Sequence, residues 1–320
     1  MKEKPWETTG MVVLQAESET SSINMVYGGA SCGKKVMTSS SSPGVSLMCE
    51  GLSYIAGAEL PCVIVDVMRG GPGLGTIQPS QSDYNQIVKG SGHGDFHNIV
   101  IAPASAQDMY DFVDWGFELA FKYRNPVVIL SDGIIGQMME KVELHPAKPR
   151  MTDEERLKAA PWATTGKPAS RERNVITSLS LDADIQEAFN RKLKNKYDII
   201  RENEVKYSEY LTDDAEYLFV AFGCSSRICE AVVDELRAQG IKAGLLRPIT
   251  LFPFPSEEIG RLAGQVRSIM SIELNLGQMV DDVRLASGGA CPVGFYGRQG
   301  GNIYTPEEIV EQFKQFNNMK

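Results

Sequence analysis

Closely spaced cysteines and histidines are scarce in this sequence of 320 residues. None of the six cysteines forms a Cys-x-x-Cys pair, and only Cys224 and Cys229 lie near each other. Because thiolates at tight spacing bind iron–sulfur clusters, we expect this chain to hold no cluster of its own. Three histidines argue against a zinc site built from this chain alone. We expect the cysteines to be reduced thiols that pack as small apolar residues.

Dense positive charge and long apolar runs are also missing. The net charge is -9, and no stretch is a block of Lys and Arg, so we expect no nucleic-acid partner. No apolar run reaches the ~18 residues of a membrane span. The first residues, Met1–Trp6, are polar and unlike a signal peptide. We therefore predict a cytoplasmic protein with no membrane partner.

Length and hydrophobic pattern predict two α/β domains joined by a linker. Residues 1–144 alternate short apolar strands with helices, which is typical of a doubly wound parallel sheet. The predicted strands are Val12–Leu14, Lys35–Thr38, Cys62–Met68, Ile99–Ala102 and Val127–Leu130. The predicted helices are Glu19–Ser31, Pro43–Ala58 and Ala106–Tyr123, the last capped by Ser105.

The remainder is predicted to be a linker followed by a smaller α/β domain. Residues 145–214 are rich in proline and charge, and Asp182–Tyr210 is predicted to be one long polar helix. Strands and helices alternate again over residues 215–320, ending in a helix that Thr305 caps and Pro306 begins.

A glycine-rich turn follows the predicted strand Cys62–Met68, with the sequence Arg69-Gly-Gly-Pro-Gly-Leu-Gly-Thr76. Open α/β sheets bind ligands beyond the carboxyl ends of their strands, where glycine lets backbone approach the ligand. An arginine at this place suits a carboxylate or a phosphate. The alternative is a solvated arginine beside an ordinary turn. A dinucleotide fingerprint is not expected, because Pro79 and a loop follow the turn where that motif requires a helix.

Seven segments in order carry a resemblance to one family. They are Gln15-Ala-Glu-Ser-Glu19, Val36-Met-Thr-Ser-Ser-Ser-Ser-Pro-Gly44, Glu59-Leu-Pro61, Arg69-Gly-Gly-Pro72, Gly92-His-Gly-Asp95, Arg247-Pro-Ile-Thr-Leu-Phe-Pro253, and Gly297-Arg-Gln-Gly-Gly301 with Thr305-Pro-Glu-Glu308. From Val12 onward the chain resembles the α-type subunit of 2-oxoacid:ferredoxin oxidoreductases. It is most similar to the branched-chain (3-methyl-2-oxobutanoate, or 2-ketoisovalerate) type.

The resemblance implies half of a shared active site. The first domain would bind the pyrimidine of thiamine diphosphate, and the second would be similar to a transketolase C-terminal domain. A β-type partner subunit would hold the diphosphate, Mg²⁺ and an iron–sulfur cluster, with γ and ferredoxin-like δ subunits completing the complex. The implied reaction is oxidative decarboxylation of a 2-oxoacid to acyl-CoA, with electrons passed to ferredoxin.

By this resemblance Glu19 and Arg69 carry the chemistry. Glu19 would hydrogen-bond N1′ of the aminopyrimidine, which favours the imino tautomer that removes the thiazolium C2 proton. The alternative for Glu19 is an acidic residue interacting with a helix dipole. Arg69 would bind the substrate carboxylate; its alternative is a scaffold arginine paired with Asp83 or Asp95.

Further site residues follow from the same motifs. Thr76 and Gln78 are predicted to line the substrate pocket, and Ile77 would suit a branched side chain. Ser42, Pro43, Gly70 and Gly71 are predicted to contact the cofactor, and a plain capped helix is the alternative for the serine run. His93 lies in a glycine-rich loop that could form a lid, or could be structural.

The sequence departs from the family at its beginning. Family members begin earlier, with a strand, a helix and a Tyr-Pro-x-Thr-Pro turn whose threonine contacts the substrate. Three explanations are open: a misplaced start, a segment on another chain, or a degenerate subunit; we favour the first. Two other functions stay open as well, a 2-oxoacid dehydrogenase component that does not use ferredoxin and a non-catalytic assembly subunit.

Overall fold

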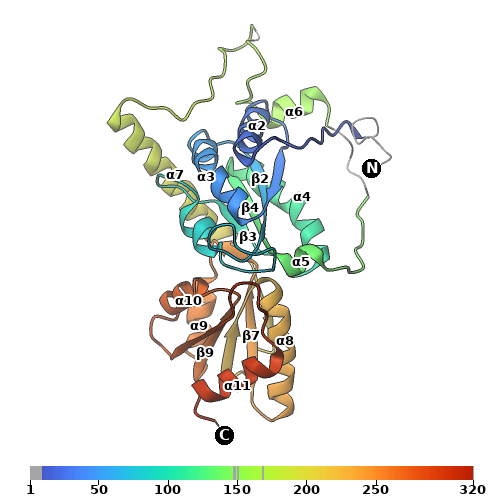
Figure 1. Ribbon diagram of the computed structural model, residues 1–320. Helices are drawn as coiled ribbons and strands as arrows, with labels where there is room; N and C mark the ends of the chain where they lie inside the picture. Colours follow the sequence, from blue (N-terminus) through green and yellow to red (C-terminus); the bar gives the residue numbers. More distant parts are fainter. Residues whose placement is uncertain (1–8, 147–148, 150, 168, 320) are drawn as a thin grey trace.

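The computed structural model describes residues 9–146, 149, 151–167 and 169–319. Within these residues the chain forms two β-sheets of five strands each, and each sheet lies in its own layered α/β unit. Figure 1 shows the two units one above the other, with the N-terminal half above and the C-terminal half below.

The first sheet is parallel except at one edge. Its strand order is β1-β2-β4-β3-β8, and β8 alone pairs antiparallel. Two crossovers run in opposite directions along this sheet, so right-handed connections set α3 and α4 on opposite faces. Figure 1 shows these helices on either side of β2 and β4. The bounds are β1 Met37–Ser40, β2 Cys62–Met68, β3 Ile99–Ile101, β4 Pro126–Asp132, β8 Thr250–Phe252, α2 Glu19–Ser31, α3 Ser42–Gly57 and α4 Ala106–Tyr123.

The second sheet has the order β10-β9-β6-β7-β5, again with one antiparallel edge strand, β5. From β6 the chain continues to β7 on one side of β6, and later it forms β9 on the other side of β6. The strand order therefore reverses between β6 and β9. The bounds are β5 Tyr207–Tyr210, β6 Tyr217–Val220, β7 Ala243–Pro248, β9 Ser268–Glu273, β10 Val293–Gly297, α8 Gly223–Ala238, α9 Ser256–Ala263, α10 Met279–Ser287 and α11 Pro306–Phe316.

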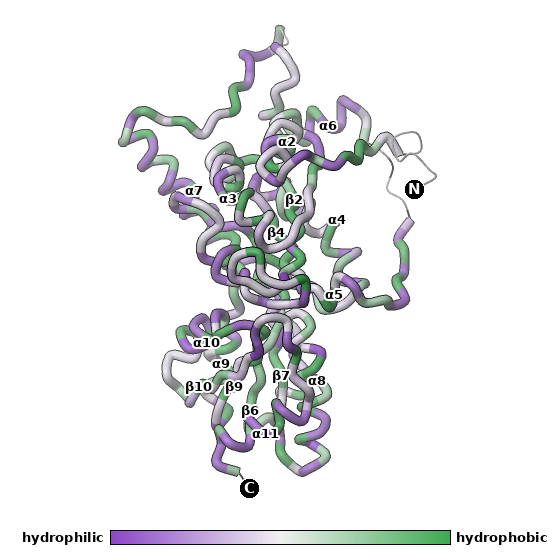
Figure 2. Tube along the Cα trace, viewed as in Figure 1, coloured by the Kyte–Doolittle hydropathy of each residue, from purple (hydrophilic) through white to green (hydrophobic). Residues whose placement is uncertain are grey.

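The linker region wraps around the first unit. Its long helix α7 packs beside α3 and begins at the end of an extended arm that projects from the molecule (Figure 1). Figure 2 shows hydrophobic residues along the central strands and alternating polar residues on α7. The long helix α7 spans Ala183–Asn203. Shorter elements lie in other connections: η1 (Asn85–Gly90), a stretch of π-helix, α5 (Gly133–Gln137) and α6 (Asp153–Ala159).

Two of the predicted elements are wrong. Val12–Leu14 is not a strand, and its three side chains are 58% to 66% exposed. The helix predicted over Asp182–Tyr210 ends at Asn203, and Tyr207–Tyr210 forms β5 against β7. Its tyrosines fit a pleated edge strand. Of the other predicted elements, α2, β2 and α4 begin and end where the sequence predicts, and β1 lies two residues later than predicted.

The predicted α/β fold class is confirmed by both sheets. Strands β2 and β4 are buried along nearly their whole length, as expected for central strands covered by helices on both faces. In the described part of the chain, no helix combines the length and apolar character needed to cross a bilayer.

Candidate active site

Glu19 lies in the first turn of α2, where the helix start fixes its position. Ser18 is the N-cap, and its side chain accepts a hydrogen bond from the Ser21 amide at 3.2 Å. The half-buried Glu19 carboxylate accepts a hydrogen bond from the Ser40 hydroxyl, with 3.5 Å between the oxygens. Since Ser40 is the last residue of β1, the carboxylate reaches the carboxyl end of that strand.

Gly44, in the first turn of α3, makes room for this carboxylate. A Cβ atom there would lie 2.7 Å from Glu19 Cγ, 2.8 Å from Glu19 Oε1 and 2.1 Å from the Ser40 hydroxyl oxygen. Such distances are shorter than carbon atoms tolerate, so only glycine fits between Glu19 and Ser40 without displacing one of them.

Arg69, directly after β2, is held by its own loop and by the start of α3. Its Nε donates to the Ser41 hydroxyl at 3.1 Å, and its Nη1 donates to the carbonyls of Leu74 and Thr76. Its backbone amide donates to Ser42 Oγ at 3.0 Å. Among the described residues Arg69 has no salt bridge within 4 Å, so the expected scaffold pairing with Asp83 or Asp95 is absent here.

The loop from Gly70 to Gln78 contacts the C-terminal unit. The Thr76 amide donates to the Gly70 carbonyl at 2.8 Å, and the Gly70 amide donates to the Gln78 carbonyl at 2.9 Å, which closes the loop. Thr76 Oγ1 donates to the carbonyl of Gly300 at 3.5 Å, and a Cβ at Gly301 would meet Gln78 at 2.1 Å. The predicted substrate residues thus sit where both units meet.

These contacts bring most of the predicted residues to one edge of the first sheet. The carboxyl ends of β1 and β2 are adjacent, and the serine run and Arg69 extend from them. Glu19 and Arg69 flank the start of α3, where Ser41, the N-cap, makes no capping hydrogen bond of its own. A carboxylate, a guanidinium and the positive end of a helix therefore surround one position.

His93 lies apart from this cluster. Its backbone carbonyl accepts a hydrogen bond from Ser53 Oγ at 2.6 Å, and its ring meets Tyr54 edge-on, with the centroids 6.4 Å apart. Ser53 is eleven residues along α3 from Ser42, about 16 Å at 1.5 Å per residue. A lid role for His93 therefore needs a movement of its loop.

Gln81 joins the two units beneath the arginine loop. Its amide nitrogen donates to the Phe222 carbonyl at 2.8 Å, and its amide oxygen accepts from Ser225 Oγ at 2.7 Å and from the Leu274 amide at 3.1 Å. These partners follow β6 and β9, where the strand order of the second sheet reverses. Ligands of doubly wound sheets usually bind at that point, and here Gln81 fills it.

Three buried carboxyl groups lie at this edge, and sequence reasoning named only Asp83 of them, as an alternative partner of Arg69. Asp132, at the end of β4, accepts hydrogen bonds from the amides of Ile134, Ile135 and Cys224, and so caps α5 while holding the start of α8. Burial raises the pKa of Asp132, and these amides oppose the shift. Asp66 and Asp83 are also buried. A charge within the apolar run Cys62–Met68 was the available signal for Asp66.

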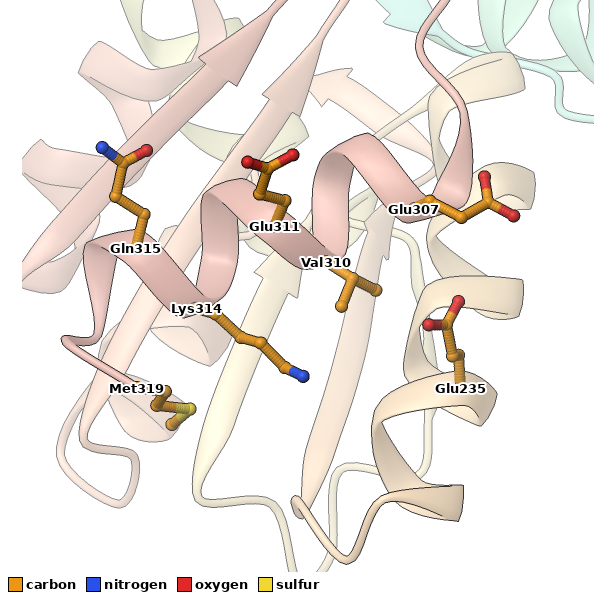
Figure 3. A pocket seen from close by; sticks show the side chains of 7 residues that line it. All are labelled: Glu235, Glu307, Val310, Glu311, Lys314, Gln315 and Met319. Atoms are coloured by element: carbon orange, nitrogen blue, oxygen red, sulfur yellow. The ribbon is translucent and has the colours of Figure 1, made fainter.

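No metal site is evident in this part of the molecule: among the described residues, no three His, Cys, Asp or Glu side chains converge as metal ligands. A surface pocket lies elsewhere, between α11 and α8 of the C-terminal unit (Figure 3). Its lining is mostly charged and includes Glu307, Glu311 and Lys314, and Lys314 donates to Gln239 at 2.6 Å. This pocket contains none of the predicted site residues.

Each of the two units matches the model of a known protein family. Residues 2–208 match the family described as pyruvate flavodoxin/ferredoxin oxidoreductase, thiamine diphosphate-binding. Residues 215–309 match pyruvate:ferredoxin oxidoreductase core domain II.

Curated relatives match along nearly the whole chain. The ketoisovalerate oxidoreductase subunit VorB of Methanothermobacter thermautotrophicus is 51% identical over 96% of this chain and 85% of its own length. The 2-oxoglutarate synthase subunit KorA of Methanothermobacter marburgensis is 36% identical over 95% of this chain and 86% of its own length.

Solved structures agree with this fold. A 2-oxoglutarate:ferredoxin oxidoreductase from Magnetococcus marinus, with 2-oxoglutarate, coenzyme A and succinyl-CoA bound, superposes with a TM-score of 0.81 at 27% identity. The match covers 97% of this chain and 58% of that one, so this chain spans little more than half of that protein's length. A split-gene transketolase, at 14% identity and a TM-score of 0.57 over 95% of this chain and 82% of its own, shares the fold.

Proposed function

This chain belongs to the 2-oxoacid:ferredoxin oxidoreductase family as an α-type subunit, and we propose that it supplies half of an active site that oxidatively decarboxylates a branched-chain 2-oxoacid. The product would be an acyl-CoA, and the electrons would pass to ferredoxin. The observation that carries the proposal is the convergence of Glu19 and Arg69 on the start of α3.

The residues at this edge fit thiamine diphosphate. Gly44 gives the Glu19 carboxylate and the Ser40 hydroxyl the room that they occupy beside the start of α3, and so fixes where the carboxylate would meet the pyrimidine ring. Glu19 would hold N1′ of the pyrimidine, and Ser42, Pro43, Gly70 and Gly71 would contact the cofactor from α3 and the arginine loop. When bound, the cofactor supplies a carbon nucleophile and an electron sink for decarboxylation.

Arg69 would orient the substrate through its carboxylate. Its Nε and Nη1 atoms are engaged by Ser41, Leu74 and Thr76, which fixes the plane of the guanidinium. With Nε and Nη1 engaged, the two hydrogens of Nη2 would be left to bind the substrate carboxylate in one orientation. Since decarboxylation disperses that charge, the contact serves mainly to position the ground state.

The same loop offers an apolar surface for the substrate side chain. Leu74 and Ile77 are 83% and 81% exposed, although a soluble chain usually covers such residues. Together with Thr76 and Gln78 they would line the pocket that accepts the branched side chain of 3-methyl-2-oxobutanoate. The relative named for ketoisovalerate supports this choice of substrate.

The site requires partners. Glu19, Arg69 and the exposed loop lie at an open edge, so a β-type subunit would complete it and hold the diphosphate, Mg²⁺ and an iron–sulfur cluster. We expect γ and ferredoxin-like δ subunits in the same cytoplasmic complex, with ferredoxin as the acceptor.

The test is reduction of ferredoxin or a viologen by the chain co-produced with its β-type partner and supplied with CoA. We expect the highest kcat/KM with 3-methyl-2-oxobutanoate among pyruvate, 2-oxoglutarate and the branched 2-oxoacids. Absence of reduction with every 2-oxoacid would refute the proposed reaction. A preference for pyruvate or 2-oxoglutarate would refute only the substrate.

A further inference from the structure

A buried pair of carboxyl groups lies directly beneath the arginine loop. Asp66 is fully buried on β2, and Asp83, 7% exposed, follows the loop. No hydrogen bond of standard geometry reaches either carboxyl oxygen of Asp66 from a described residue, although the Ser42 amide lies close enough to lower the pKa of this group. Its side chain instead meets the carboxyl group of Asp83. Two carboxyl groups can hydrogen-bond to each other only when one of them carries a proton.

Ser42 connects this pair to Arg69. Its hydroxyl donates to Asp83 Oδ2, lies 3.2 Å from the Arg69 carbonyl and accepts from the Arg69 amide at 3.0 Å. The hydroxyl has one proton, so Asp83 determines which way it points. Asp83 thereby orients the Ser42 hydroxyl, which accepts the hydrogen bond from the Arg69 amide. Asp66 in turn holds the carboxyl group of Asp83 in place.

The surroundings favour retention of one proton by the pair. Burial raises the pKa of Asp66 well above its usual value, the charge of Asp83 and the hydrogen bond with it act in the same direction, and the Ser42 amide opposes the shift. Burial also raises the pKa of Asp83, while Ser42 and the charge of Arg69 oppose that shift. Besides Arg69, the ionisable group among the described residues that faces the pair is Cys49 on α3. Burial raises the pKa of this thiol, so it adds no charge at neutral pH.

We propose that Asp66 and Asp83 share one proton and act, through Ser42, as positioning residues that hold Arg69 for the substrate carboxylate. They touch neither substrate nor cofactor. Loss of the shared proton would leave two buried carboxylates in contact, which repel one another, move Asp83 and release Ser42. The effect on Arg69 rests on the proposed function; the shared proton does not.

The sign of the pH effect on stability follows from the raised pKa values. The unfolded chain releases these protons near pH 3.9, whereas the folded chain keeps at least one to higher pH. The folded state therefore binds more protons, and the free energy of unfolding falls as pH rises through the folded pKa of the pair. The substrate KM should rise through the same pH range.

Three variants of the full chain, assembled with its β-type partner, test the proposal. Asp66→Asn keeps a hydrogen bond to the Asp83 carboxylate without a titrating proton. It should remove the alkaline loss of thermal stability and the alkaline rise in KM, with kcat changed less than about threefold. Ser42→Ala should keep the alkaline loss of stability and remove the parallel rise in KM. Asp66→Leu, which leaves no donor for Asp83, should raise KM about tenfold or more at neutral pH.

The outcomes separate the parts of the proposal. An alkaline loss of stability that persists in Asp66→Asn would overturn the shared proton, whatever the activity of the complex. Asp66→Asn could also remove the loss of stability at high pH and leave the rise in KM unchanged. That result would overturn the link to Arg69. If the complex has no activity with any 2-oxoacid, the stability measurement still decides whether the proton is shared.

Discussion

At the residue scale, one glycine controls the position of the proposed catalytic carboxylate. Gly44→Ala should displace Glu19 or Ser40, because the new methyl group would lie within 2.8 Å of both side chains. We expect the affinity for thiamine diphosphate to fall about tenfold or more and stability to fall by about 1–3 kcal/mol, the usual cost of overpacking.

Gly28 in α2 provides a matched control for this prediction. It is also a helical glycine, but a Cβ there would meet nothing within 4 Å. Gly28→Ala should raise helix stability by about 0.5–1 kcal/mol and leave cofactor affinity unchanged. Isothermal titration of the two assembled complexes with cofactor compares them directly. Equal affinities would mean that cofactor binding does not depend on the room that Gly44 leaves for Glu19.

Arg69 should not tolerate a change to lysine. Lysine keeps the charge but cannot bond Ser41, Leu74 and Thr76 simultaneously in one plane. We expect Arg69→Lys to raise KM for the 2-oxoacid about 10–100-fold, the value of a hydrogen bond to a charged group, with a smaller change in kcat. Arg284→Lys, at an exposed pair with Asp281, is the control and should change neither constant. A loss confined to kcat would contradict a role in substrate orientation.

At the same scale, sequence reasoning located the side chains that extend from the carboxyl edge of the first sheet, but it did not identify the buried polar groups below that edge. The positions of Glu19 and Arg69 at this edge could be predicted, because a motif and a strand end place them. Asp66 could not be assigned, because its partner Asp83 is 17 residues away and meets it only after the loop folds back. The role of Gln81 could not be predicted either, because its side chain bonds a carbonyl and an amide of the second unit, far away in the sequence.

At the element scale, a buried ion cluster fixes helix α7 to the first unit. Glu59 bonds Lys192 and Lys196, both on α7, and Arg124 lies beside them. Although burial opposes it, these cations hold the pKa of Glu59 below its usual value. Burial lowers the pKa of Lys196 to about 8, and the charge of Glu59 counteracts this effect.

Glu59→Gln should therefore loosen α7. We expect a loss of about 1–3 kcal/mol at pH 7, because the buried Lys196 loses its counter-charge. The loss should be smaller at pH 9, where Lys196 is largely neutral in the folded chain and needs no counter-charge. Hydrogen exchange over Ala183–Asn203, combined with denaturant unfolding at both pH values, measures the effect.

The control for this helix is Glu187→Gln, which breaks an exposed pair with Arg191. It should change stability by less than about 0.5 kcal/mol. A loss in Glu59→Gln that grows between pH 7 and pH 9 would contradict the assignment of Lys196 as the buried partner.

Element types and most boundaries could be predicted, because strand burial and helix caps are local properties. The two errors have tertiary causes. Tyr207–Tyr210 becomes a strand because the edge of β7 is available to it, and Val12–Leu14 finds no strand to pair with in this chain. The antiparallel strand β8, which closes the first sheet from the second half of the sequence, could not be foreseen from local pattern either.

At the scale of the whole molecule, the buried Gln81 side chain is one of several polar links between the two units, beside the bonds that Tyr84 makes to Asp282 and Gln278 makes to Ser82. Gln81→Ala would leave the Phe222 carbonyl, Ser225 and the Leu274 amide short of a partner in a buried junction. An unsatisfied buried group costs about 1–3 kcal/mol. We expect calorimetry to show a lower melting temperature and two separated transitions, where the wild type shows one.

Gln86→Ala is the control, since the Gln86 side chain bonds Ser46 and Cys49, both on α3 of the first unit. It should keep a single transition. One transition in both variants, with equal melting temperatures, would mean that the junction does not depend on Gln81.

The central claim is that this chain provides the carboxylate on which the cofactor chemistry depends. The most direct measurement compares Glu19→Gln with Glu17→Gln in the complex with the β-type partner, using 3-methyl-2-oxobutanoate, CoA and ferredoxin. Glu17 lies two residues earlier and is exposed, so its change should leave turnover intact. Glu19→Gln should lower kcat at least about 100-fold, within the range of general acid–base effects. Equal turnover in both variants would contradict the claim.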